Sequence, residues 1–84
     1  MPFDVAPRSL ASLRAGEPAE VQHILFDSVR DHCAHAGLRE GSRVVGRGLR
    51  GSDVALETGT GTVVVLNGVL ARFVHVVEPR ASHA

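Results

Sequence analysis

Residues 54–66 read VALETGTGTVVVL, and this stretch decides the fold class of the chain. Two runs rich in valine and leucine, 54–58 and 62–66, flank the glycine-rich segment 59–61, a pattern typical of a β-hairpin with a tight loop. No lysine follows these glycines, so the segment does not match a phosphate-binding loop. The stretch therefore predicts two antiparallel strands joined by a short turn.

The residues before the hairpin predict one more strand and a turn. Val44 and Gly46 alternate with Arg43 and Arg47, so one face of a strand can be buried while the arginines stay solvated. Residues 48–53 contain two glycines and predict a turn. The arginine-bearing strand therefore leads through this turn into the hairpin.

The first forty residues predict a helical turn, a strand and one short helix. Ser9 is expected to cap the helical turn, and the run 21–25 predicts a strand, although its alternation is imperfect. Asp27 or Ser28 offers an N-cap to a helix that ends at Gly37. The apolar positions of that helix share one face at helical spacing, and they are Val29, Cys33 and Ala36.

The residues after the hairpin predict a short turn and a last strand. Asn67 and Gly68 interrupt the apolar pattern, and residues 69–71 fit a single helical turn. Residues 73–77 predict a strand that stops before Pro79, because proline cannot continue the ladder of hydrogen bonds.

Together these elements predict a mainly β fold, a small five-stranded SH3-like barrel with one short helix and an N-terminal helical turn. A chain of 84 residues has room for a single core, so we expect one domain over residues 8–78 with flexible termini at 1–7 and 79–84. The expected core consists of apolar strand positions, namely Val21, Val44, Leu56, Val64, Leu66, Val74 and Val76.

The composition argues against several classes of function. All nine basic residues are arginine and nine acidic residues balance them, so the zero net charge argues against a nucleic-acid partner. Tryptophan and tyrosine are absent, which disfavours a base-stacking surface. The single cysteine, Cys33, cannot form an internal disulfide, and the longest apolar run, 63–66, is too short to span a bilayer. We therefore expect a cytoplasmic protein without direct membrane insertion.

Three motifs follow one another along the chain. Leu10, Leu13 and Gly16 form an opening Leu-x-x-Leu-x-x-Gly before the first predicted strand, and the helix ends in Gly-Leu-x-x-Gly over residues 37–41. A closing element consists of Leu66, Ala71, Val74 and Val76. The order and spacing of these motifs resemble the pattern of the ferrous iron transport protein A (FeoA) family. The resemblance covers nearly the whole chain and implies an SH3-like fold.

The resemblance implies a function as well as a fold. It implies a small, non-catalytic, cytoplasmic accessory protein of ferrous iron uptake that binds the cytosolic part of the ferrous iron permease, which carries a GTPase domain, and modulates it. The alternative is a stand-alone metal-responsive domain, akin to the C-terminal domain of iron-dependent repressors, which shares the SH3-like module. A second copy of the chain is a further candidate partner. No nucleophile, base and orienting group can be named together, so we do not expect an enzyme.

The chain departs from the family pattern in three places. Cys33 stands where leucine is more frequent, residues 51–53 read Gly-Ser-Asp in place of a Gly-Asp-Pro turn, and Asn67 replaces an expected arginine. The core tolerates these exchanges, whereas a function that depends on that arginine would not.

One helix carries the candidate metal ligands. Asp31 and His35 are four residues apart and share a helical face, which His32 borders. Carboxylate and imidazole groups bind zinc and ferrous iron, but structural zinc sites use four protein ligands and this set supplies at most three. We therefore expect no required cofactor and only weak binding of Fe²⁺ or Zn²⁺, and ordinary surface polarity explains the same residues.

An apolar surface is the first candidate for partner contact. Val69 and Leu70 stand where the resemblance leads us to expect charged residues, and with Leu10 and Leu13 they would form an exposed apolar patch. The alternative is that these four side chains close the open end of the barrel.

An arginine-bearing strand face is the second candidate. Arg43 and Arg47 project from one face of their strand, and such a face can meet an acidic partner. The alternative is a solvated strand face balanced by Glu40, Asp53 and Glu57.

Overall fold

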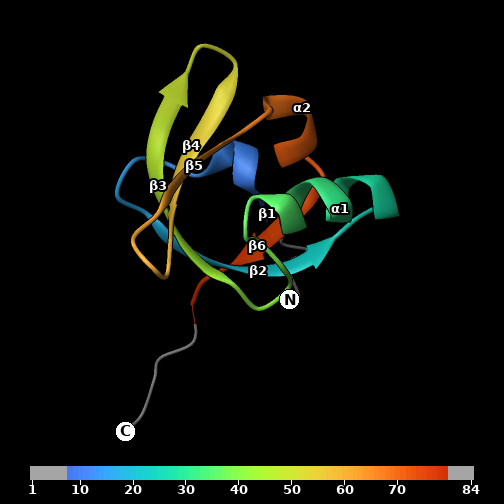
Figure 1. The fold of residues 1–84 in the computed structure, drawn as a ribbon. Coiled ribbons are helices and arrows are strands. Elements are labelled where there is room, and N and C mark those ends of the chain that lie inside the picture. The colour runs from blue at the N-terminus through green and yellow to red at the C-terminus, as the bar shows by residue number, and fades with distance from the viewer. Residues whose placement is uncertain (1–7, 80–84) are drawn as a thin grey trace, which may run out of the picture.

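The computed structural model describes residues 8–79, which form one six-stranded antiparallel sheet and short helical segments (Figure 1). Residues 1–7 and 80–84, the greater part of the predicted flexible termini, lie outside the described residues. In chain order the elements are β1 (Arg8–Ser9), the 3-10 helix η1 (Leu10–Ser12), β2 (Pro18–Ile24), α1 (Asp27–His35), β3 (Arg43–Arg50), β4 (Asp53–Thr58), β5 (Val63–Leu66), α2 (Gly68–Ala71) and β6 (Val74–Val77).

The sheet has the strand order β1-β6-β2-β3-β4-β5. The first half of β2 pairs with β3 and its second half pairs with β6, so this strand connects the two parts of the sheet. Register shifts interrupt the β2–β6 and β3–β4 ladders, and such irregularities bend and twist a sheet. The expected mainly β class is confirmed, with six strands in place of five because Arg8 and Ser9 pair with Val76 and His75.

The hairpin over residues 54–66 forms as predicted, but the turn before it is shorter than expected. β3 continues to Arg50, and only Gly51 and Ser52 separate it from β4. Gly48 has a φ of 92° and lies within the register shift, where the ladder is interrupted between Gly46 and Leu49. A glycine in the left-handed region accommodates this irregularity without steric cost, so the strand resumes where the sequence alone predicts a turn.

The helix starts differ from the predicted caps. α1 begins at Asp27, but its N-cap is Phe26, whose φ is 67° and whose carbonyl accepts a hydrogen bond from the Arg30 N–H at 3.0 Å. Neither Asp27 nor Ser28 is therefore the N-cap. Ser9 is the N-cap of η1 but makes no side-chain cap. The hydroxyl of Ser12 donates to the Ser9 carbonyl at 2.8 Å.

The core lies against the inner face of the curved sheet and includes side chains from η1 and α1. Six of the predicted core residues are buried there, namely Val21, Val44, Leu56, Leu66, Val74 and Val76. Val64 is only partly buried because β5 is an edge strand. Cys33 is fully buried as expected, and burial raises the pKa of its thiol, which disfavours a reactive thiolate.

Candidate partner-binding groove

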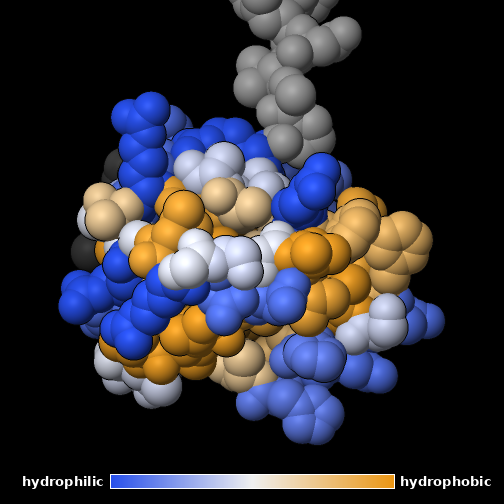
Figure 2. Space-filling model, turned by 90° about the horizontal axis from the view of Figure 1, so that it is seen from above, coloured by the Kyte–Doolittle hydropathy of each residue, from blue (hydrophilic) through white to orange (hydrophobic). Residues whose placement is uncertain are grey.

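A shallow groove lies between α2 and the β3–β4 hairpin. Both elements are found at the top of Figure 1. It encloses about 330 Å³ and is lined by Ala11, Leu49, Ser52, Val54, Asn67, Gly68, Val69 and Arg72. Leu49 and Val69 are 66% and 62% exposed, although both are large aliphatic residues. Figure 2, which views the molecule from this side, shows hydrophobic surface interrupted by hydrophilic side chains. We call this feature the α2 groove.

Two residues at the start of α2 build one wall of the α2 groove. The side-chain oxygen of Asn67 accepts a hydrogen bond from the Val69 N–H at 2.8 Å, which caps the helix. Gly68 lies directly against the turn between β3 and β4, since a Cβ at this position would be 2.1 Å from the carbonyl oxygen of Ser52 in that turn. Ala71 is fully buried and anchors the helix, and Val69 points outward.

The irregularity in β3 builds the opposite wall. The ladder resumes with Leu49 opposite Val54, on the side of the hairpin that faces α2. Val54 is buried, whereas its ladder partner Leu49 is exposed. The sequence analysis assigned Leu49 to a turn and missed it, because the register shift that places Leu49 here depends on the pairing of β3 with β4.

The predicted apolar patch divides between the core and the surface. Leu10 and Leu13 are 0% and 5% exposed, so the expectation that they lie on a contact surface is wrong. They are buried because η1 packs against α2 and β6 and directs both leucines into the core. Leu70 is partly buried against the same core, and only Val69 of this set is freely exposed. The barrel-closing alternative therefore holds for the leucines and not for Val69.

The arginines differ in how they are paired. Arg47 lies 3.3 Å from a carboxylate oxygen of Glu57, and Arg43 lies 4.0 Å from Glu20, so this strand face is balanced within the chain. Both arginines are exposed, as predicted, and the pairing favours the solvated-face alternative. The side chain of Arg72, which lines the α2 groove, makes no hydrogen bond or ion pair within the described range 8–79. Its guanidinium charge is thus available to an external carboxylate.

The proposed metal ligands lie around a hollow of about 290 Å³ on the exposed side of α1. Asp31, His32 and His35 line it, but the Nδ1 of His35 donates to the backbone carbonyl of Asp31 at 2.8 Å. Among residues 8–79, no three histidine, cysteine, aspartate or glutamate side chains are grouped so that they could hold a metal ion. The predicted set of Asp31, His32 and His35 therefore does not assemble into a metal centre, because a single helix face does not bring the three groups to one point.

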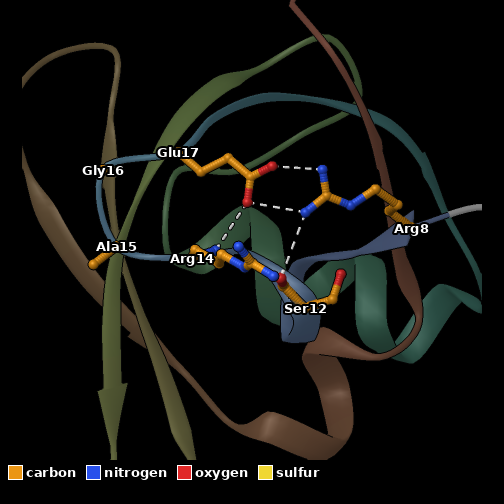
Figure 3. A pocket seen from close by; sticks show the side chains of 6 residues that line it. All are labelled: Arg8, Ser12, Arg14, Ala15, Gly16 and Glu17. Carbon is orange, nitrogen blue, oxygen red and sulfur yellow. Dashed lines mark hydrogen bonds and ion pairs between the residues drawn. The ribbon is translucent and has the colours of Figure 1, made fainter.

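A second hollow, of about 680 Å³, is polar (Figure 3). The Glu17 carboxylate accepts from the Arg8 guanidinium, with one bond of 2.9 Å, and from the Arg14 N–H at 3.0 Å. The hydrogen bond from Arg8, followed by that from the Arg14 backbone, lowers the pKa of Glu17 to about 2. These contacts tie β1 to the loop before β2, which indicates a structural role.

A third polar cluster joins β2 to α1 and the loop after it. Glu40 accepts from the Ile24 N–H at 3.0 Å and from Arg30 at 3.1 Å, and the Ile24 hydrogen bond is the main reason that the pKa of Glu40 is lowered. His23 contacts the same carboxylate at 3.0 Å and lies opposite His75 in the ladder. These contacts tie β2 to the loop after α1, which indicates a structural role for His23.

The sheet order and the covering helices define a small SH3-like domain. No family model matches the sequence, and no curated protein matches it significantly. Solved structures do match, and they show that this is the fold of FeoA proteins. A crystallised iron uptake regulatory protein, FeoA, is 20% identical and superposes with a TM-score of 0.76 over 87% of this chain and 97% of its own. The resemblance inferred from the motifs is thereby confirmed at the level of the fold.

Two further solved structures show in which kinds of protein this fold occurs. A FeoA-like protein from Clostridium acetobutylicum is 20% identical, with a TM-score of 0.75 over 93% of each chain. A manganese-dependent transcriptional repressor in complex with manganese is 22% identical, with a TM-score of 0.77 over 90% of this chain but 38% of its own. The same module therefore occurs alone and as part of a longer protein.

The helices within residues 8–79 are all too short, or too polar, to span a membrane.

Proposed function

We propose that this protein is a non-catalytic, cytoplasmic accessory factor of ferrous iron uptake, which docks on the cytosolic part of the ferrous iron permease and modulates it. The likeness to FeoA structures over 87% and 93% of the chain supports this assignment. The α2 groove is the contact that we assign to the partner.

The observation that carries the proposal is the exposure of Leu49 and Val69 on either side of one groove. Exposed apolar side chains gathered at one site mark interaction surfaces, because burying them against a partner removes apolar area from water. The groove volume of about 330 Å³ lies at the lower limit for small-molecule pockets. It suits one or two apolar side chains of a protein partner better than a whole cofactor.

Arg72 adds a chemical requirement for the partner. Its guanidinium lines the α2 groove without an acidic partner in the part of the chain that the structure describes. An arginine at the rim of an apolar contact pairs well with a carboxylate. The partner segment that docks in the α2 groove therefore contains an apolar residue next to an aspartate or glutamate.

Titration calorimetry with the purified cytosolic domain of the permease tests the proposal. Val69→Glu places a carboxylate in the apolar contact and is expected to weaken binding at least about tenfold, a typical effect at an interface hot spot. Ala34→Glu is the matched control, because Ala34 is exposed on α1 and does not line the α2 groove. Equal affinity of the two variants, or no binding by the unmodified protein, contradicts the proposal.

The metal-responsive alternative receives no specific support from the site. Its ligands would be Asp31, His32 and His35, which the structure does not group as a metal-binding set. The repressor likeness concerns the fold of one part of that longer protein.

A further inference from the structure

β5 forms one edge of the sheet and pairs only with β4 among residues 8–79. Its four residues, Val63–Leu66, contain no charge and no proline. Natural proteins usually protect a sheet edge with lysine, proline, a bulge or a covering element. This edge carries none of the protecting residues, and Val63 and Val65 are 46% and 47% exposed.

Hydrogen-bonded and non-hydrogen-bonded residue pairs alternate along the β4–β5 hairpin, and this alternation determines which backbone groups of β5 point outward. The Thr58 N–H donates to the Thr62 carbonyl at 2.8 Å, so this pair is a hydrogen-bonded one. Such pairs alternate along an antiparallel ladder, and Val64 opposite Leu56 is therefore the next. Val63 and Val65 then direct their N–H and C=O groups away from β4, toward the open edge.

We propose that two copies of this chain associate through their β5 edges in antiparallel pairing about Val64. In this register Val64 lies opposite Val64 of the second copy, and Val63 lies opposite Val65 of the second copy. Each Val63–Val65 pair exchanges two backbone hydrogen bonds, because both residues carry the outward groups. The two sheets join into one continuous sheet across a twofold axis.

The side chains favour a second copy as the occupant of this edge. Val63 and Val65 project to the same face and would form a cluster with the same residues of the second copy. The flanking segments 60–62 and 66–68 would lie opposite each other, and they hold no charged residue. The formal net charge of zero removes general repulsion between copies. The edge is thus complementary to itself in backbone hydrogen bonding, in its exposed valines and in charge.

Sedimentation over a concentration series tests the association. The unmodified chain is expected to show a monomer–dimer equilibrium, weak because a four-residue strand gives a small interface. Val65→Lys is expected to raise the dissociation constant at least about tenfold, because it places a charge in the valine cluster. Val77→Lys, at an exposed valine of β6, which β2, β3 and β4 separate from β5 in the sheet, is the matched control and is expected to dimerise as the unmodified chain does.

A charge-pair experiment tests the register. Lysine at position 63 of one variant, Val63→Lys, lies opposite glutamate at position 65 of the other, Val65→Glu, only in the pairing about Val64. A mixture of the two is expected to associate more tightly than either alone. Amide exchange at Val63 and Val65 is expected to slow as concentration rises, while Val64 is unchanged.

Three results overturn the proposal. They are a chain that stays monomeric at about 1 mM, where a dimer of millimolar dissociation constant would be populated; a dimer that Val65→Lys does not weaken; and a mixture of the charged variants that associates no more tightly than its components. Circular dichroism of each variant confirms that the fold is retained, and Val63→Lys provides the second single-site variant should Val65→Lys not fold.

Discussion

The substitution Gly68→Ala, at the base of the α2 groove, has two opposing effects on the free energy of unfolding. Alanine favours a helix over glycine by about 1 kcal/mol, and less in a helix of four residues such as α2. The added Cβ, however, would lie 2.1 Å from the carbonyl oxygen of Ser52, a backbone atom, where ordinary contacts begin at 3.4 Å. The hairpin turn must therefore move away by more than about 1 Å, and overpacking of this kind costs about 1–3 kcal/mol.

The clash exceeds the gain in helix propensity, so we expect Gly68→Ala to lower the free energy of unfolding by about 1–2 kcal/mol. Urea denaturation monitored by circular dichroism measures the change. The slope of the unfolding free energy against urea concentration is expected to stay the same. Gly59→Ala is the matched control, since its Cβ would lie 3.9 Å from the nearest atom, and it is expected to stay within about 0.5 kcal/mol of the unmodified protein. Equal or greater stability of Gly68→Ala would refute the close approach of α2 to the hairpin turn.

Two further variants test the core and the polar hollow. Leu66→Ala is expected to cost about 2–5 kcal/mol in urea denaturation, because Leu66 is 3% exposed and leaves a cavity; an unchanged midpoint would contradict its place in the core. Glu17→Gln is expected to lessen the acid sensitivity of folding: a folded pKa of about 2, below the ordinary 4.5, contributes stability above 4.5 that is lost as the pH falls through about 2. Thermal melts from pH 6 to pH 2 that are parallel for both proteins would show that the Arg8–Glu17 contact contributes nothing.

The sequence predicts those elements whose signals are local. The hairpin over 54–66 has alternating apolar residues and a glycine turn, and the structure has β4 and β5 within one residue of the expected limits. The helix before Gly37 is also correct in extent, because its buried positions, Val29 and Cys33, recur at helical spacing. The arrangement of these elements in an SH3-like fold came from the order of motifs along nearly the whole chain.

The remaining features depend on contacts between distant segments. Phe26 becomes the N-cap of α1 although its side chain cannot cap, and its ring packs edge-to-face on Phe73 at 5.3 Å. Leu49 becomes exposed on the groove because the ladder shifts register at Gly48, which composition alone does not reveal. α2 has four residues, too few for a hydrophobic period, so the sequence does not indicate that Val69 faces solvent and Leu70 the core.

The proposed docking through the α2 groove is tested most directly by nuclear magnetic resonance. The ¹⁵N-labelled protein is titrated with the unlabelled cytosolic domain of the ferrous iron permease, and amide shifts are mapped on the structure. We expect the largest changes at Leu49, Val69 and Arg72, and none at His32 and His35 on the exposed side of α1. A spectrum unchanged at saturating partner, or changes confined to α1, would contradict the proposed function of this groove.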